Sequence, residues 1–201
     1  PAARPGSASA EAGSAATDEG LLDRIAEGDE RAFRRLVERH IDRAYALALR
    51  ILKRPADAED VVQDTMLKVW THRGRWQAGR ARFSTWLYRV VTNRCIDLIR
   101  QPAGQDLAVT QEPIDAGVDA MRALMRREAL DALEAAMERL PAQQRVALIL
   151  SYHEGLGNAE IAEVMATTVM AVESLLKRAR EQMRKTLRRS GDDLIAALTD
   201  D

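Results

Sequence analysis

The stretch DAEDVVQDTMLKVWTHRGRWQAGRARFSTWLYRVVTNRCIDLIR, residues 57–100, changes its charge abruptly. Residues 57–64 hold four carboxylates and no basic residue, whereas residues 72–100 hold seven arginines and one acid, Asp97. The formal net charge of -1 hides this contrast, because it averages over blocks of opposite sign. An acidic surface followed at once by an arginine-rich, tryptophan-containing surface predicts two partners, a basic protein face and a polyanion.

Apolar residues in and around this stretch recur every three or four positions, which is the period of a helix buried along one face. The pattern predicts a long helix after a capping Asp29, a second helix over residues 58–70 and a third that starts near Ser84. No run of five or more residues alternates with period two, so we predict an all-α fold. The expected core residues of the three helices are Phe33, Leu36, Val37, Ile41, Ala44, Leu47, Ala48 and Ile51, then Ala58, Val61, Val62, Thr65, Met66, Val69 and Trp70, then Leu87, Val90, Val91, Cys95, Leu98 and Ile99.

Changes in composition divide the chain into two helical domains with three other segments. Residues 1–17 are small residues with Pro, Gly and Ser, a composition typical of a disordered tail. Residues 101–120 carry two prolines, two glycines and four acids, which predicts a flexible acidic linker. We therefore predict helical domains over residues 18–100 and 121–190, and a C-terminal tail over 191–201.

The second domain has the layout of a helix-turn-helix, in which the second helix enters the major groove of DNA. Asn158 is the expected cap of a short helix, residues 166–168 make the turn, and a second helix follows. Between residues 172 and 189 that helix carries seven basic residues against two acids, which favours binding to phosphates. A solvated face of an ordinary helix pair is the alternative. The apolar positions expected to face inward are Leu130, Leu133, Met137 and Leu140, then Val172, Leu175, Leu176, Ala179, Met183 and Leu187.

Residues 73–100 mix arginines with four aromatic side chains, Trp76, Phe83, Trp86 and Tyr88. Aromatic rings stack on unpaired bases while arginines follow the backbone, so this segment is typical of a single-strand binding surface. Half of these aromatics are equally well explained as core residues.

Catalysis and metal binding have little support in the sequence. The single cysteine, Cys95, excludes an internal disulfide and a multi-cysteine zinc site. Three histidines, at positions 40, 72 and 153, have no ligand spacing, and no phosphate-cradling glycine loop is present. We expect no enzyme activity, no cofactor and no metal. Without an apolar run long enough for a membrane span or a signal segment, we expect a cytoplasmic protein with no membrane insertion.

Three blocks of this sequence resemble the signatures of bacterial extracytoplasmic-function (group 4) sigma factors of the sigma-70 family. They are DAEDVVQDTMLKVW, FSTWLYRVVTNRCIDLIR and LPAQQRVALILSYHEGLGNAEIAEVMATTVMAVESLLKRAREQMRKTL. The resemblance implies a sigma-two and a sigma-four domain in a factor that binds core RNA polymerase, directs it to promoters and helps to open them. It further implies contacts with the β′ clamp and the β flap, and control by an anti-sigma factor in a stress or envelope response.

The resemblance also assigns roles to residues, position by position. The residues that resemble the docking helix for the β′ clamp are Asp57, Glu59, Asp60, Val61, Gln63, Asp64 and Lys68. Those that resemble the region capturing and melting the minus-ten element are Arg75, Trp76, Arg82, Phe83, Thr85, Trp86, Tyr88, Arg89, Asn93 and Arg94. Those that resemble the minus-thirty-five reader are Thr168, Glu173, Ser174, Lys177, Arg178 and Arg180.

Two positions depart from the family pattern. Ala166 stands where the family usually has glycine in the turn, and a left-handed backbone there would cost alanine about 1 kcal/mol. Leu175 stands where many members have arginine, which suggests an altered promoter contact or an apolar surface for a partner. The alternatives to a sigma factor are a two-domain DNA-binding regulator and an α-helical adaptor, and the adaptor would leave the clustered arginines unexplained.

Overall fold

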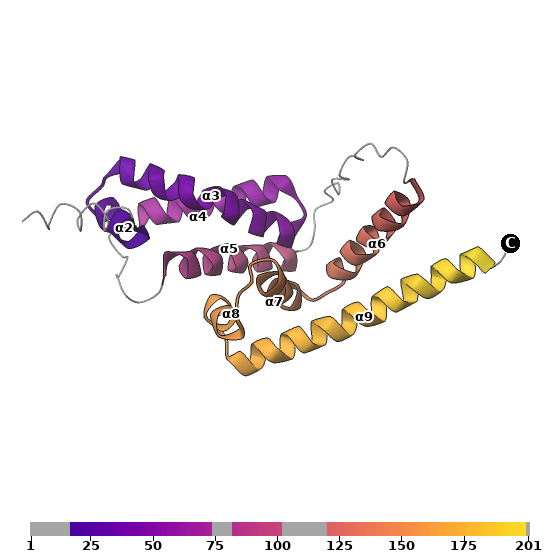
Figure 1. Cartoon of the computed structure of the whole chain (residues 1–201). Helices are drawn as coiled ribbons and strands as arrows, with labels where there is room; N and C mark the ends of the chain where they lie inside the picture. The colour runs from indigo at the N-terminus through magenta and orange to yellow at the C-terminus, as the bar shows by residue number, and fades with distance from the viewer. Residues whose placement is uncertain (1–16, 74–81, 102–119, 200–201) are drawn as a thin grey trace, which may run out of the picture. The chain divides into compact units, whose positions relative to one another are not determined.

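The computed structural model describes residues 17–73, 82–101 and 120–199, with side chains in the last range described for residues 127–188 (Figure 1). The described residues fold into helices and contain no strand, which confirms the all-α prediction. None of these helices is both long and apolar enough to span a membrane. The helices are α2 (Asp18–Ala26), α3 (Glu30–Leu52), α4 (Pro55–Thr71), α5 (Phe83–Arg100), α6 (Ala120–Glu138), α7 (Ala142–Tyr152), α8 (Asn158–Val164) and α9 (Val169–Thr199).

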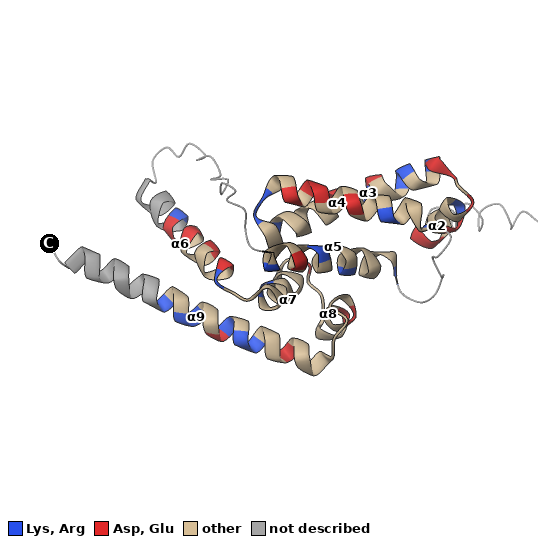
Figure 2. Ribbon diagram, turned by 180° about the vertical axis from the view of Figure 1, so that it is seen from behind, with Lys and Arg blue, Asp and Glu red and all other residues tan. Residues whose placement is uncertain are grey.

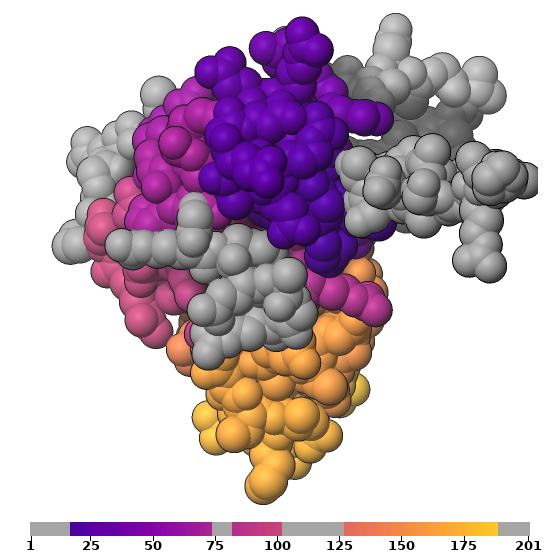
Figure 3. All heavy atoms as spheres, turned by 90° about the vertical axis from the view of Figure 1, so that its left-hand side faces the viewer, coloured from indigo at the N-terminus to yellow at the C-terminus, as the bar shows by residue number. Residues whose placement is uncertain are grey.

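The helices belong to two compact units, Pro1–Asp97 and Leu98–Asp201. In the first unit α3 packs against both α2 and α4, and the space-filling view shows α2 and α3 as one continuous indigo surface (Figure 3). Local chemistry fixes the ends of these helices. Asp29 caps α3 as predicted, because its Oδ1 accepts hydrogen bonds from the backbone N–H groups of Arg31 and Ala32 at 2.8 and 3.0 Å. Lys53 ends α3 in the left-handed conformation, and Pro55 begins α4.

Aromatic contacts attach α5 to α3. The Phe83 and His40 rings form a T-shaped pair with their centres 5.0 Å apart, and the Arg43 guanidinium lies 5.4 Å from the centre of the Tyr88 ring. The His40 ring is in turn held by Asp18 at 2.8 Å. The helix predicted to start near Ser84 begins at Phe83, so Ser84 lies inside α5 and is not its cap. These contacts fix the start of α5 against the N-terminal helices.

In the second unit α7, α8 and the first part of α9 enclose a core of Val146, Ile149, Leu150, Ile161, Val172 and Leu176. Helix α6 joins α9 through a smaller cluster of Ala136, Leu140, Ala179 and Met183. The Arg145 side chain closes the junction between α6 and α7: its Nε donates to the Met137 carbonyl at 3.1 Å and its second nitrogen to the Glu138 carbonyl. Two carbonyls at the end of α6 are therefore satisfied by one guanidinium.

The apolar pattern predicted a wider core than the structure has. Ile41, Leu130 and Leu133 are exposed, and the two leucines lie outside the cluster of Ala136, Leu140, Ala179 and Met183 that joins α6 to α9. Leu175 is half-buried, between the buried positions Val172 and Leu176 and the exposed position Ser174. The cap of α8 is Gly157 rather than Asn158, and the Glu160 carboxylate accepts the Gly157 N–H at 2.9 Å.

Candidate protein and nucleic-acid interfaces

One face of α4 is acidic and exposed. Asp60, Gln63, Asp64 and Leu67 follow one another at intervals of three, one and three residues, which places them on the same side of a helix. All four side chains are exposed, and Leu67 is exposed to 58% in spite of its apolar character. We call these four residues the docking face; it lies on the helix that carries a run of red in Figure 2. Leu67 was missed by the sequence reasoning, although its spacing from Asp64 was a usable signal.

The other residues predicted to dock differ in accessibility. Glu59 and Lys68 are exposed and flank the docking face. Asp57 is half-buried, and its Oδ2 lies 2.7 Å from an Arg54 nitrogen; this is a charge contact, since that oxygen has no aligned hydrogen-bond partner among the described residues. Val61 is exposed to only 1%, so it packs into the core and supports the helix from behind.

An ion pair connects the docking face to α5. The Arg94 Nε lies 3.9 Å from the Asp64 Oδ2, and both side chains are about half exposed. Asp64 belongs to the predicted protein-binding set and Arg94 to the predicted nucleic-acid set. The two predicted surfaces therefore meet at this pair.

On α5 and at Arg82, which directly precedes it, the predicted nucleic-acid residues separate into a solvent-facing and a buried group. Arg82, Arg89 and Asn93 are exposed, and Thr85, Trp86 and Arg94 are half-buried. Phe83 and Tyr88 are exposed to only 1% and 4%, so their rings are core residues that cannot stack on a base where they lie. Trp86 is stacked on Phe83 with ring centres 5.7 Å apart. Arg75 and Trp76 lie outside the described residues.

Helix α9 presents the basic face that the sequence predicted, and Figure 2 shows it as a row of blue segments. The helix starts at Val169, and the Thr168 Oγ1 accepts the Ala171 N–H at 3.2 Å. Ala166 has a φ of 51°, so the left-handed backbone expected in the turn is present without a glycine. The exposed side chains on α9 include the predicted residues Glu173, Ser174, Lys177, Arg178 and Arg180.

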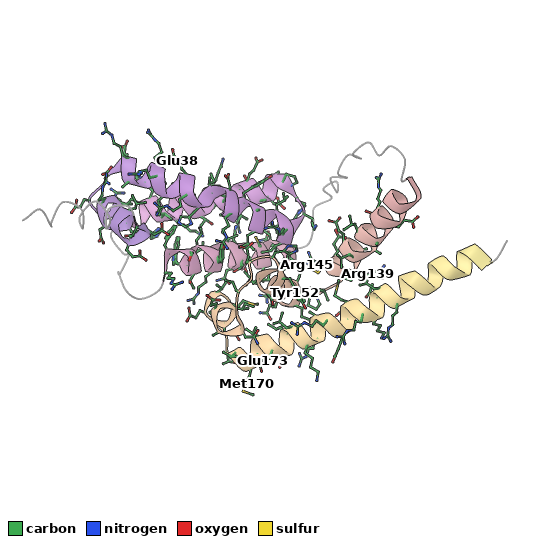
Figure 4. The ribbon with its side chains drawn as sticks, in the orientation of Figure 1. Glu38, Arg139, Arg145, Tyr152, Met170 and Glu173 are labelled. Carbon is green, nitrogen blue, oxygen red and sulfur yellow. The ribbon has the colours of Figure 1, made fainter. Side chains whose placement is uncertain are left out.

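An aromatic residue from α7 holds one of these basic side chains. The Arg180 Nε donates to the Tyr152 hydroxyl at 3.3 Å, and the guanidinium carbon lies 5.7 Å from the centre of the Tyr152 ring. Tyr152 is itself largely exposed, and Figure 4 labels it at the end of α7. No sequence signal pointed to this contact, since 28 residues separate the two positions.

A basic groove of about 500 Å³ follows the same helix, lined by Arg139, Arg178, Glu181, Gln182, Lys185 and Thr186. Three basic side chains against one acid make it suited to anions. No group of three or more His, Cys, Asp or Glu side chains in the described ranges could hold a metal. The one cysteine, Cys95, is buried, and burial raises the pKa of its thiol to about 12.

Comparison with known proteins agrees with this geometry. The family model for Sigma-70 region 2 matches residues 36–104, and that for Sigma-70 region 4 matches residues 130–183. The ECF RNA polymerase sigma factor SigW of Bacillus subtilis is 30% identical over 83% of this chain and 95% of the relative. The RNA polymerase sigma-H factor of Pseudomonas aeruginosa is 32% identical over 85% of this chain and 93% of the relative.

Two solved structures are also similar. CnrH, solved in complex with the cytosolic domain of CnrY, has a TM-score of 0.63 at 27% identity and covers 86% of this chain and 97% of its own. RpoE of Bartonella quintana, solved with the anti-sigma factor NepR, shares the fold at 22% identity and a TM-score of 0.58, over 78% of this chain and 96% of its own. The two matched sigma-70 regions, and relatives matched over nearly their whole length, show that this chain belongs to the ECF sigma factors of the sigma-70 family.

Proposed function

We propose that this sigma factor binds core RNA polymerase through the docking face of α4, holds the opened minus-ten strand along α5, and reads the minus-thirty-five element with α9. Sigma factors are transcription initiation factors rather than enzymes, in agreement with a molecule whose described surfaces are suited to binding. We infer that it works in the cytoplasm, where core polymerase and promoter DNA are found. The two binding surfaces of this chain differ in charge: the surface on α4, for a protein partner, is acidic, and the surface on α9, for DNA, is basic.

The observation that carries this proposal is the docking face. Asp60 and Asp64 are both exposed, one helical turn apart, and Leu67 adds an exposed apolar group beside them. Acidic side chains around an apolar contact are the expected counterpart of a basic protein surface, in which the apolar centre contributes affinity and the charged rim contributes specificity. A stand-alone DNA-binding regulator has no need of such a face.

The test reverses the charge of the docking face. We expect Asp60→Lys/Asp64→Lys to weaken binding to immobilised core polymerase by at least about tenfold, because opposite charges across an interface become like charges. Asp60→Lys alone separates this effect from the ion pair that Asp64 makes with Arg94. Leu67→Ala should weaken binding without changing its salt dependence, since it removes apolar contact and no charge.

The matched control is Glu38→Lys. Glu38 is an exposed acid on α3 in the same unit, labelled in Figure 4, and lies outside the docking face. This control should bind core polymerase as the wild type does. Unchanged affinity in the double variant, or equal losses in the control and the double variant, would remove the support for the docking assignment.

An anti-sigma partner completes the proposal. CnrH and RpoE were each solved with a protein bound, and we infer that a regulatory protein of this kind occupies the docking face or α9 when this factor is inactive, as in a stress or envelope response. A co-purified partner should then compete with core polymerase for the chain. Simultaneous binding of both would contradict the inference.

A further inference from the structure

Met170 is the most exposed large apolar side chain in the described part of the chain, at 77%. It lies in the first turn of α9, and Figure 4 shows its sulfur projecting beyond the end of the helix. A solitary exposed apolar side chain needs no explanation, because folded proteins expose many of them. The residues beside Met170 on the helix indicate what its exposed side chain contacts.

Met170, Glu173, Ser174 and Lys177 occupy one exposed stripe along the first three turns of α9. The opposite face of the same turns is buried through Val172, Leu176 and Ala179, which hold the helix in its unit. In a helix-turn-helix the N-terminal residues of the second helix contact the edges of the bases. The stripe therefore occupies the positions that read sequence, and its chemistry can be compared with the groups that each base presents.

We propose that Met170 and Glu173 determine the specificity of α9, Met170 by contacting the C5-methyl group of a thymine and Glu173 by accepting a hydrogen bond from the N4 amino group of a cytosine. The proposal rests on the proposed role of α9 as the promoter reader. The thymine methyl is the apolar group that the major groove offers, and the cytosine amino group is a donor that a carboxylate can accept. A carboxylate facing guanine O6 and N7 or thymine O4 would meet acceptors only.

The spacing of the two residues restricts the bases that they read. A separation of three residues corresponds to about 4.5 Å along a helix axis, whereas successive bases of one strand rise by about 3.4 Å. Met170 and Glu173 therefore reach the same or neighbouring steps of the duplex. We expect the preferred minus-thirty-five element to contain a T·A pair next to a C·G pair, with thymine and cytosine on whichever strand faces the helix.

The first experiment determines the preferred element and its dependence on Glu173. Full-length protein is assembled with bacterial core polymerase, and the holoenzyme selects from duplex promoters randomised over the minus-thirty-five region. Glu173→Gln should change one preferred base from cytosine to adenine by about tenfold, because a glutamine side chain pairs bidentately with adenine N6 and N7. The same preferred base in both selections would overturn the role of Glu173.

The second experiment removes the methyl group from the DNA instead of the protein. Replacing the selected thymine by 2′-deoxyuridine should weaken wild-type holoenzyme binding by about fourfold, the worth of one buried methyl-sized group. Met170→Ala should bind the thymine and deoxyuridine promoters equally. If deoxyuridine weakens binding of the Met170→Ala holoenzyme by the same factor as it weakens wild-type binding, the methyl contact is overturned. If Met170→Ala changes only the binding of a protein partner, Met170 belongs to that partner's surface instead.

Two controls separate this inference from the proposed function. Both substitutions lie at exposed helix positions, and unchanged thermal unfolding by circular dichroism shows that neither acts through folding. A wild-type holoenzyme that enriches no sequence contradicts the promoter-reading role and the inference with it. A holoenzyme that enriches a sequence which both variants also select leaves the proposed function standing and overturns only the inference.

Discussion

Ala166 holds a backbone conformation that residues with a Cβ atom rarely adopt. Its φ of 51° lies in the left-handed region, at the turn between α8 and α9. The Cβ atom is close to a backbone oxygen in this region, and glycine avoids the contact. The turn that aims α9 is therefore mildly strained.

We expect Ala166→Gly to stabilise the second unit by up to about 1 kcal/mol, because it removes this strain. The greater conformational freedom of glycine in the unfolded chain offsets part of the gain. Chemical unfolding followed by circular dichroism measures the change. Ala135→Gly, at an exposed position inside α6, is the matched control and should destabilise instead. A loss of stability in both variants would show that the turn carries no strain.

Cys95 gives a pH dependence with a defined sign. Burial raises the pKa of the Cys95 thiol from an ordinary value of 9.0 to about 12. Above pH 9 the unfolded chain loses this proton while the folded chain keeps it, so the free energy of unfolding decreases as pH rises. We expect wild type to lose up to about 1.4 kcal/mol per pH unit more than Cys95→Ala between pH 9 and 10.5. Parallel pH profiles of the two proteins would contradict the assignment.

At the scale of one helix junction, Arg145 has a structural task. Its guanidinium donates to the carbonyls of Met137 and Glu138, and burial lowers its pKa while the nearby Glu138 partly opposes the shift. We expect Arg145→Met to destabilise the second unit by about 0.5–1.5 kcal/mol, because the Glu138 carbonyl loses this donor and the Met137 carbonyl keeps only the Leu140 N–H. Arg145→Lys should recover only part of this, since a lysine lacks the planar fork. Thermal unfolding that is equal in wild type and Arg145→Met would exclude the role.

Local chemistry explains which elements could be predicted. Asp29 as a cap and the turn at residues 166–168 followed from short-range signals, and the structure has both. The side chains that differ depend on distant partners: Phe83 contacts His40 of α3 and is buried, whereas Leu130 lies outside the cluster that joins α6 to α9 and is exposed. A periodic pattern identifies an apolar face, but the packing of other helices decides how much of that face is covered.

The same reasoning applies to the candidate site. The docking face and the basic face of α9 could be predicted because charge patterns are local to one helix. The Tyr152–Arg180 contact could not, because α7 and α9 must first pack to bring the two side chains together. Leu67 was predictable in position but was passed over, since an apolar residue in an amphipathic helix is usually expected in the core.

At the scale of the whole molecule, the two units differ in their spectroscopic signals. All three tryptophans, Trp70, Trp76 and Trp86, belong to the unit Pro1–Asp97, and the other unit has none. Each unit has its own buried core, built around Leu36 and Leu150 respectively. Tryptophan fluorescence therefore reports unfolding of the first unit, whereas circular dichroism reports helix loss in both.

We expect Leu150→Ala to cost about 2–5 kcal/mol of stability, as other buried leucine truncations do. The substitution should lower the unfolding midpoint of the second unit, seen as an earlier component of the circular dichroism transition. The midpoint of the tryptophan fluorescence transition should not change. Leu36→Ala is the matched reverse and should lower the tryptophan transition. A single transition that moves equally by both probes in both variants would show that the chain unfolds as one cooperative unit.

The Asp64–Arg94 ion pair can couple the proposed protein-binding surface to the proposed nucleic-acid-binding surface. A ligand that binds the side chain of one member must break the pair. The free energy of breaking the pair is then the coupling between the two ligands, and it is the same for whichever ligand binds first. Because both side chains are about half exposed and 3.9 Å apart, the pair is worth at most about 1 kcal/mol. Through this pair alone, occupancy of one surface can change the affinity of the other by no more than about fivefold.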